Sequence, residues 1–388
     1  MSMPPYITEK VVDETPPEKI TGEIQDKDVV ENLSVDSTRK ELPLPTLEEI
    51  RDAIPPECFK KSDAKSCFYL ALDYVFIATC YLLLPYFEGY GGFVGLLGWY
   101  WMMGLFLSGL FMIGHDCGHD SFSDNKILND IAGNLAYSPI MTPFWPIQKA
   151  HRRHHRHTNH VQKDRHWNSG RHWNSEEEFH GSSWLERQLA KFPLMGFVAH
   201  CHYALRGSRW MLLLAILEAF RQQYRTSPMF CEHCSVPRLL GDRLQPLAYS
   251  FVKYYFVPIL FHDFWMVMVT TLQHAEDETE AYEEGTWTYL KGQAQTIDRK
   301  YGLVPDFVLH HITDGHVVHH FFQRIPHYNL VEATKAVRSL LEKYPGAYKY
   351  RSSPNYLLEF LRLNHESEYL IGKGSGVRKY NVSKEFAD

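Results

Sequence analysis

Residues 93–119 read FVGLLGWYWMMGLFLSGLFMIGHDCGH, and the first 22 of them carry no charge. An α-helix needs about 20 apolar residues to cross the hydrocarbon core of a bilayer, which is about 30 Å thick. His115 and His119 follow directly and are four residues apart, so they share one face if the helix continues. The stretch therefore predicts a membrane-spanning helix that ends in a pair of imidazoles.

Two further histidine clusters have helical spacing. They read His151-Arg-Arg-His154-His155 and His316-Val-Val-His319-His320. Residues at i, i+3 and i+4 lie on one side of a helix, so each cluster would point three imidazoles in one direction. If all three clusters converge, they predict a dinuclear metal site. The residues alone leave the metal open, because imidazole binds iron, zinc, copper and nickel.

A second apolar stretch, residues 67–87, precedes the first and is interrupted only by Asp73. Residues 88–92 between them are rich in glycine and predict a tight helical hairpin. Lys and Arg are absent from this turn, whereas four basic residues precede residues 67–87: Arg51, Lys60, Lys61 and Lys65. The positive-inside rule then predicts that the N-terminus and the first two histidine clusters face the cytosol.

The rest of the membrane topology is less regular. Residues 249–273 form a third apolar block, which Lys253 and the pair His262-Asp263 interrupt. Residues 210–220 are apolar but too few to span, so we expect an interfacial helix or a half-span. The chain must cross an even number of times between the second and third clusters if these are to meet. Either the third block is re-entrant or a hairpin, or a weak span is hidden near 192–220.

Outside these stretches the sequence predicts two terminal tails and gives only weak evidence for further binding sites. Residues 1–42 are acidic with few aromatic residues and predict a disordered tail, while 371–388 form a C-terminal tail after a domain at 43–370. A net charge of −6 excludes little. The basic tract 151–172 follows a span, which favours anionic lipid over nucleic acid as its partner. The spacing Cys231-Glu-His-Cys234 has no second pair and is weak evidence for a metal or redox site.

The three clusters resemble the histidine boxes of the membrane fatty acid desaturases, and within them the methyl-end (Δ12/ω6 and ω3) acyl desaturases. The similarity covers roughly residues 43–369. Residues 95–101 and 143–146 resemble most the animal Δ12-type enzymes, with the ω3 enzymes as the alternative. The other matching motifs are Thr158-Asn-His160, Leu272-Gln-His274, Gln295-Thr-Ile-Asp-Arg299, Ile312-Thr-Asp-Gly-His316, Ile325-Pro-His-Tyr328 and Glu332-Ala-Thr-Lys335.

This resemblance implies an all-α integral membrane fold, a mushroom-shaped bundle of four transmembrane helices with a cytosolic helical cap. It also implies a histidine-ligated diiron site in the cap. His160 and His310 match recurring positions in the family, where a hydrogen-bonding role near the metals is at least as expected as ligation. The implied ligands are His115, His119, His151, His154, His155, His274, His316, His319 and His320.

The implied reaction inserts a cis double bond into a long-chain unsaturated acyl group, phospholipid- or CoA-linked, with O2 as co-substrate and two iron ions as cofactor. The sequence has no His-Pro-Gly-Gly haem motif, so we expect no bound haem or flavin and no fused cytochrome b5 domain. The resemblance implies cytochrome b5 and its NADH-dependent reductase as electron donors. It also implies the endoplasmic reticulum membrane, with both termini cytosolic.

Two departures from the family pattern keep other functions open. Residues 221–245 are polar where family members have an apolar span, and His262-Asp263 interrupts the third block. An Asp at the centre of a span costs about 3 kcal/mol on insertion scales. The alternatives are an inactive homologue, a diiron lipid hydroxylase that uses the same boxes, and a histidine-rich metal-binding membrane protein.

Overall fold

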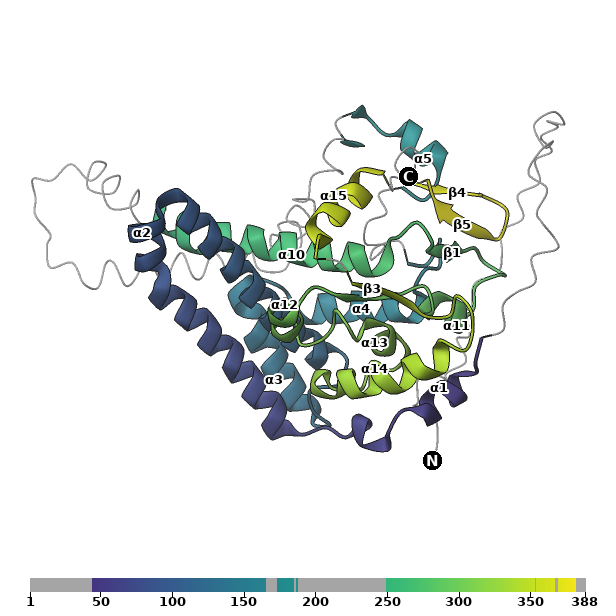
Figure 1. Cartoon of the computed structure of the whole chain (residues 1–388), viewed down its shortest axis with the longest axis horizontal. Helices are drawn as coiled ribbons and strands as arrows, with labels where there is room; N and C mark the ends of the chain where they lie inside the picture. The colour runs from purple at the N-terminus through teal and green to yellow at the C-terminus, as the bar shows by residue number, and fades with distance from the viewer. Residues whose placement is uncertain are drawn as a thin grey trace, which may run out of the picture. The chain divides into compact units, whose positions relative to one another are not determined.

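The computed structural model describes residues 44–164, 173–184, 186–187, 249–352, 354–366 and 369–381. These residues are mostly helical (Figure 1). The helices are α1 (Leu47–Ala53), η1 (Pro56–Phe59), α2 (Asp63–Gly118), α3 (Lys126–Tyr137), η2 (Ser138–Ile140), α4 (Phe144–His157), α5 (Glu176–Gly181), the π-helical η3 (Val252–Phe256), α10 (Val257–His274), α11 (Tyr289–Gln293), α12 (Leu303–Val308), α13 (His316–Phe321), α14 (His327–Leu341) and α15 (Tyr356–Glu366).

Helix α2 contains both N-terminal apolar stretches and reverses direction between them. The reversal is at Gly92, whose φ of 54° and ψ of −134° suit glycine because it has no Cβ. The indole Nε1 of Trp99 donates a 2.7 Å hydrogen bond to the carbonyl of Cys80, so the two arms pack side by side. Figure 1 shows them as two arms that meet at one end. The hairpin returns the chain to the side on which it began, which places His115 near the start of α2.

Helix α10 packs against the second arm of α2. A Cβ on Gly104 would lie only 2.7 Å from the backbone carbon of Phe261, so the two helices approach closely at this glycine. Nearby, the indole Nε1 of Trp265 donates to the carbonyl of Trp101 at 3.2 Å. Both α2 and residues 249–274 are long and apolar enough to cross a membrane.

The polar residues that interrupt the third apolar block face protein. Lys253 forms a 2.6 Å ion pair with Glu88 at the turn of the hairpin. His262 is buried with its Nδ1 3.0 Å from the hydroxyl of Ser108, and Asp263 next to it is also buried. This placement offsets part of the insertion cost that the sequence alone predicted for the block, because lipid does not meet these groups. Residues 1–42, expected to be a disordered tail, and residues 210–245 lie outside the described residues.

The expectation of a purely helical fold was incomplete, because the described residues include two small sheets. One is a three-stranded sheet in the order β1-β5-β4, and the other pairs β2 with β3 in parallel. Strands of two to four residues are too short to show the alternating pattern by which a strand is predicted. Residues 377–380, within the segment expected as a C-terminal tail, form β5. The strands are β1 (Glu280–Tyr282), β2 (Ile297–Lys300), β3 (Lys349–Ser352), β4 (Leu370–Ile371) and β5 (Val377–Tyr380).

A separate apolar core supports the third histidine cluster. Val317 and Phe321 of α13 are buried against Leu330 and Val337 of α14, together with Ile50 of α1. The short α13 has only six residues, too few to be stable alone, so this packing is what keeps it helical. The apolar side of α13 is thereby fixed in one direction and its three histidines in the other.

We expect Gly104→Ala to lower the stability of the purified protein by about 1–3 kcal/mol, because the added methyl group collides with the backbone of α10. The measurement is the melting temperature in detergent. Gly98→Ala on the same arm is the matched control, since a Cβ there meets nothing within 4 Å. Equal melting temperatures for the two variants would contradict the close approach of α2 and α10.

Candidate metal centre

The end of α2 presents His115 and His119 on one face. The backbone N–H of His119 bonds the carbonyl of His115 at 3.1 Å, so the last turn is still helical and the ring centroids are 4.6 Å apart. The chain then turns away at Asp120, whose φ is 57°. The first box is therefore held by the end of an apolar helix, as its sequence position predicted.

Helix α4 brings the second box to the first. His154 and His155 are buried, and the Nε2 atoms of His151 and His155 are 3.0 Å apart. The rings of His119 and His155 lie with centroids 4.5 Å apart. Boxes separated by more than 30 residues of chain thus share one site.

The third box and the last turn of α10 complete the arrangement. His319 of α13 has its Nε2 3.1 Å from Nε2 of His155. His316, one turn earlier, has its Nε2 2.9 Å from Nε2 of His274. The rings of His155 and His320 lie with centroids 4.2 Å apart, so the contacts form a continuous set.

Eight of the nine histidines form two adjoining groups. In each group the ligand atoms lie within 4.8 Å of one another. His316 lies beside the second group, with its ring centroid 4.4 Å from that of His320. The first group is His115, His119, His151, His155 and His319, and the second is His154, His274 and His320.

The donors fit a metal better than they fit one another. Within the described residues, the buried Nε2 atoms of His119 and His320 have no hydrogen-bond partner. A neutral imidazole has one N–H, so crowded nitrogens cannot all be satisfied by hydrogen bonds among themselves. Metal bonds of about 2.1 Å at right angles would separate neighbouring nitrogens by about 3 Å, which matches the contacts above.

Hydrogen bonds from outside fix two of these rings. The Nδ1 of His154 lies 2.9 Å from a carboxylate oxygen of Asp164, and the other oxygen accepts from the backbone N–H of Asn159 at 3.0 Å. The Nδ1 of His320 lies 2.9 Å from the amide oxygen of Gln293. Each bond leaves Nε2 as the metal-facing donor, an arrangement typical of metal-binding histidines.

The centre is electrostatically set for neutral imidazoles. Burial first, and then the neighbouring imidazoles, hold the pKa of six of these histidines well below the ordinary value. Neutral imidazole is the form that binds metal, so at pH 7 these rings are in the ligating form. The six are His119, His151, His155, His316, His319 and His320.

Comparison with known proteins identifies the family. The family model described as fatty acid desaturase matches residues 69–352, most of the chain and all four elements that carry the nine histidines. The chain belongs to the fatty acid desaturase family. Desaturases are oxidoreductases that act on acyl lipids, so the sequence prediction of the family and of the enzyme class is confirmed.

Three relatives illustrate how far the similarity extends. This desaturase is 40% identical to the "Delta(12) fatty acid desaturase fat-2" of Caenorhabditis elegans, over 89% of this chain and 93% of that protein. It is 38% identical to the "Omega-3 fatty acid desaturase fat-1" of the same organism, over 92% and 90%. It is 33% identical to the "sn-1 acyl-lipid omega-3 desaturase (ferredoxin)" of Synechocystis, over 89% and 96%.

A chain of buried polar groups adjoins the first box of the desaturase. Asp116 has one oxygen 3.5 Å from Nδ1 of His115 and the other 2.9 Å from Nδ1 of His327. The ring of His327 lies 4.5 Å from that of His310, whose Nε2 is 2.9 Å from Asp73. Asp73, the single acidic residue of the apolar stretch 67–87, therefore has a buried partner in the segment between α12 and α13. His310 lies beside the centre and not among its donors, whereas the sequence left both roles open.

The remaining predicted positions lie apart from the two groups. His160 is 3.1 Å from Glu284 and belongs to neither group, and Cys117 is buried without being a donor to either. Cys231 and Cys234, and residues 165–172 of the basic tract, lie outside the described residues. Sequence reasoning missed Asp164, Gln293 and His327, which hold donors rather than provide them.

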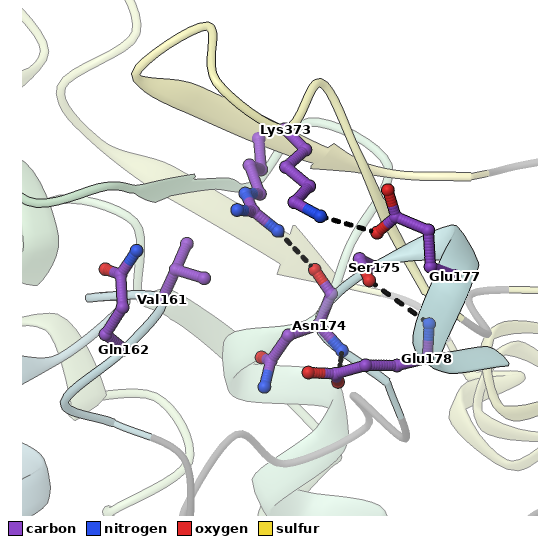
Figure 2. Close-up of a pocket in the computed structure, with 8 residues that line it drawn as sticks. Val161, Gln162, Asn174, Ser175, Glu177, Glu178 and Lys373 are labelled. Carbon is purple, nitrogen blue, oxygen red and sulfur yellow. Dashed lines mark hydrogen bonds and ion pairs between the residues drawn. The ribbon is translucent and has the colours of Figure 1, made fainter. Parts of the chain in front are cut away.

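A surface pocket of the desaturase lies elsewhere and contains none of the nine histidines (Figure 2). Its charged residues pair with one another. Lys373 lies 2.9 Å from Glu177, and the guanidinium of Arg378 donates to the carbonyl of Asn174 at 2.6 Å. These contacts join the α5 segment to the β4–β5 hairpin, and the pocket provides no chemistry of its own.

We expect Asp164→Asn to weaken metal binding about 10–100-fold, because the amide no longer holds the His154 ring with the strength of a carboxylate. The measurement is metal affinity by competition with a chelator. Glu284→Gln is the matched control, since it removes the carboxylate that pairs with His160, outside both groups. Unchanged affinity in Asp164→Asn would mean that this pair does not support the centre.

Proposed function

We propose that this protein is a Δ12 (methyl-end) acyl desaturase, which inserts a cis double bond into a long-chain unsaturated acyl group of a membrane lipid or CoA ester. The observation that supports this proposal most is the convergence of nine imidazoles, eight of them in two groups, from α2, α4, α10 and α13. The Δ12 position is favoured by the likeness of residues 95–101 and 143–146 to animal Δ12-type enzymes and by the 40% identity to a named Δ12 relative. The ω3 position is the second candidate, because an ω3 relative is 38% identical.

We propose further that the two groups hold two iron ions, with His316 as the fourth donor of the second group. Iron supplies, when bound, the O2-dependent oxidation that an unactivated methylene pair requires and that acid–base side chains cannot perform. The protein's own residues keep the donors neutral and oriented, and keep bulk water away by burying them. His274 is the donor that lies outside the three boxes.

The balance of the reaction defines the partners. Removal of two hydrogens from the acyl chain and reduction of O2 to two waters takes up two further electrons and two protons. A separate carrier supplies these electrons in our proposal, namely cytochrome b5 with its NADH-dependent reductase. The printed name of the Synechocystis relative includes ferredoxin, which is also a separate electron carrier. We place the protein in the endoplasmic reticulum membrane, with the boxes and both termini on the cytosolic side.

Expression in a yeast that lacks polyunsaturated fatty acids tests the reaction. We expect linoleate to accumulate from the yeast's own oleate, as seen by mass spectrometry of fatty acid methyl esters. A product formed only after linoleate is fed would establish the ω3 reaction instead. A product with an added oxygen would establish a hydroxylase, and no product from either substrate in a metal-loaded protein would establish an inactive homologue.

Substitution of one donor from each group tests the metal assignment. We expect purified His319→Ala and His274→Ala to contain fewer than two iron ions per chain and to lose turnover, because each removes an imidazole from a different group. Iron is measured by mass spectrometry of the purified protein. His157→Ala, on the same helix as the second box but outside both groups, should keep its iron. Full iron content and activity in His274→Ala would restrict the site to the three boxes.

A further inference from the structure

Helix α4 has a second face that the centre does not use. Lys149, Arg153 and Arg156 are exposed and recur at i, i+4 and i+7, so they form one stripe. At 100° per residue this stripe lies on the side of α4 opposite to the second histidine box. We call these three residues the outer stripe. One short helix thus has imidazoles on the inside and cations on the outside.

Among the described residues, the outer stripe has no acidic partner, unlike the cations next to it. Arg152 lies 2.8 Å from Asp120, and Lys163 lies 2.8 Å from Glu284. No described carboxylate lies within ion-pair distance of the three cations of the outer stripe. Three like charges along a helix repel one another, so the stripe does not stabilise the fold by ion pairing. This arrangement is typical of a surface that binds an acidic partner.

The proposed reaction requires an electron donor that comes close to the metal centre. Each double bond takes up two electrons that the acyl chain does not supply. An α-helix with its side chains is about 10–12 Å across, so a carrier seated on the outer face of α4 is one helix away from His151, His154 and His155. Helix α4 therefore carries both metal-binding histidines and exposed positive charge, and an electron would travel only a short distance across it.

Lipid headgroups are a less suitable partner for most of the stripe. The start of α4 packs on apolar residues, with Phe144 on Tyr137 and Tyr137 stacked on Phe111 of α2. Just past the end of α4, the indole of Trp287 donates to the carbonyl of Thr158 at 2.9 Å. The stripe therefore runs from the end that packs on α3 and α2 toward Trp287.

The distances along α4 decide between the partners. At 1.5 Å per residue, Lys149 is about 6 Å from the exposed Trp145, Arg153 about 12 Å and Arg156 about 16 Å. Attraction to anionic headgroups falls off within a Debye length, about 8–10 Å. Along the helix axis, Lys149 is within that range of Trp145, and the two arginines are beyond it.

We propose that the outer stripe of α4 is the docking site of the one-electron carrier protein, which presents an acidic surface around its redox centre. This inference rests on the proposed desaturase function. Exposed ion pairs add little affinity singly, but a row of charges speeds encounter and orients the partner. The stripe should therefore govern how much carrier is needed and leave the turnover at saturating carrier unchanged.

The test uses the purified iron-loaded protein in phosphatidylcholine vesicles, with the soluble domain of cytochrome b5, its reductase and NADH. The variant is Arg153→Glu/Arg156→Glu. The matched control is Lys300→Glu/Lys343→Glu, which makes the same charge change at two exposed lysines elsewhere in the cap. At low salt we expect the half-saturating concentration of cytochrome b5 to rise at least 10-fold in the variant and less than twofold in the control. In about 0.5 M salt the difference should shrink, because salt screens these charges.

Two further measurements distinguish the docking proposal from the proposed desaturase function. After anaerobic reduction of the iron with dithionite, removal of the excess reductant and admission of O2, variant and wild type should form equal product in a single turnover. No product from the wild type with either donor would refute the proposed function, and direct binding of cytochrome b5 to wild type and variant would then still test the stripe. A variant that matches the control with cytochrome b5 overturns the docking proposal. The proposal is also overturned if the variant binds phosphatidylserine vesicles more weakly than the wild type but depends on cytochrome b5 in the same way. The stripe would then bind lipid headgroups.

Discussion

The six imidazoles of the centre whose pKa is lowered can lie this close together only while they remain uncharged. Ring nitrogens 2.9–3.1 Å apart would repel strongly if protonated, and burial would add the cost of desolvating each charge. The lowered pKa values of His155 and His319 are the direct sign of that constraint. A metal relieves it, because neutral imidazoles then face a cation instead of one another. The surrounding helices must hold this arrangement together before any metal enters.

The apolar hairpin and the cap share that task. Helix α2 is stable in lipid because its backbone groups are bonded within the helix, so it can end in polar residues without losing its shape. Helix α13 has only six residues and depends on α14 for its position. The pair of Asp73 and His310 joins the apolar stretch 67–87 to the segment between α12 and α13. An acidic residue that is costly in a membrane helix thus has a buried partner.

Sequence reasoning found what depends on local periodicity. The two arms of α2, the three boxes and His274 at the end of α10 follow from apolar length, from i, i+3, i+4 spacing and from likeness to a family. The small sheets could not be predicted, because their strands have only two to four residues and pair with segments distant in the chain. Asp164 and Gln293 were missed for a related reason. Each meets its histidine through folding, and neither stands at a helical spacing from it.

Helix α4 shows why periodicity alone leaves such roles undecided. The basic tract 151–172 begins on this helix, and its composition suggested anionic lipid as a partner. In the fold, the period of 3.6 residues divides the basic residues of this helix, so that histidines lie inside and cations outside. The inner face is fixed by its contacts with three other elements, and therefore the direction of the outer face is fixed as well. Helix α4 therefore fixes the position of any partner on the outer stripe relative to the imidazoles. The same 14 residues can thus set both the position of the donors and the side from which electrons arrive.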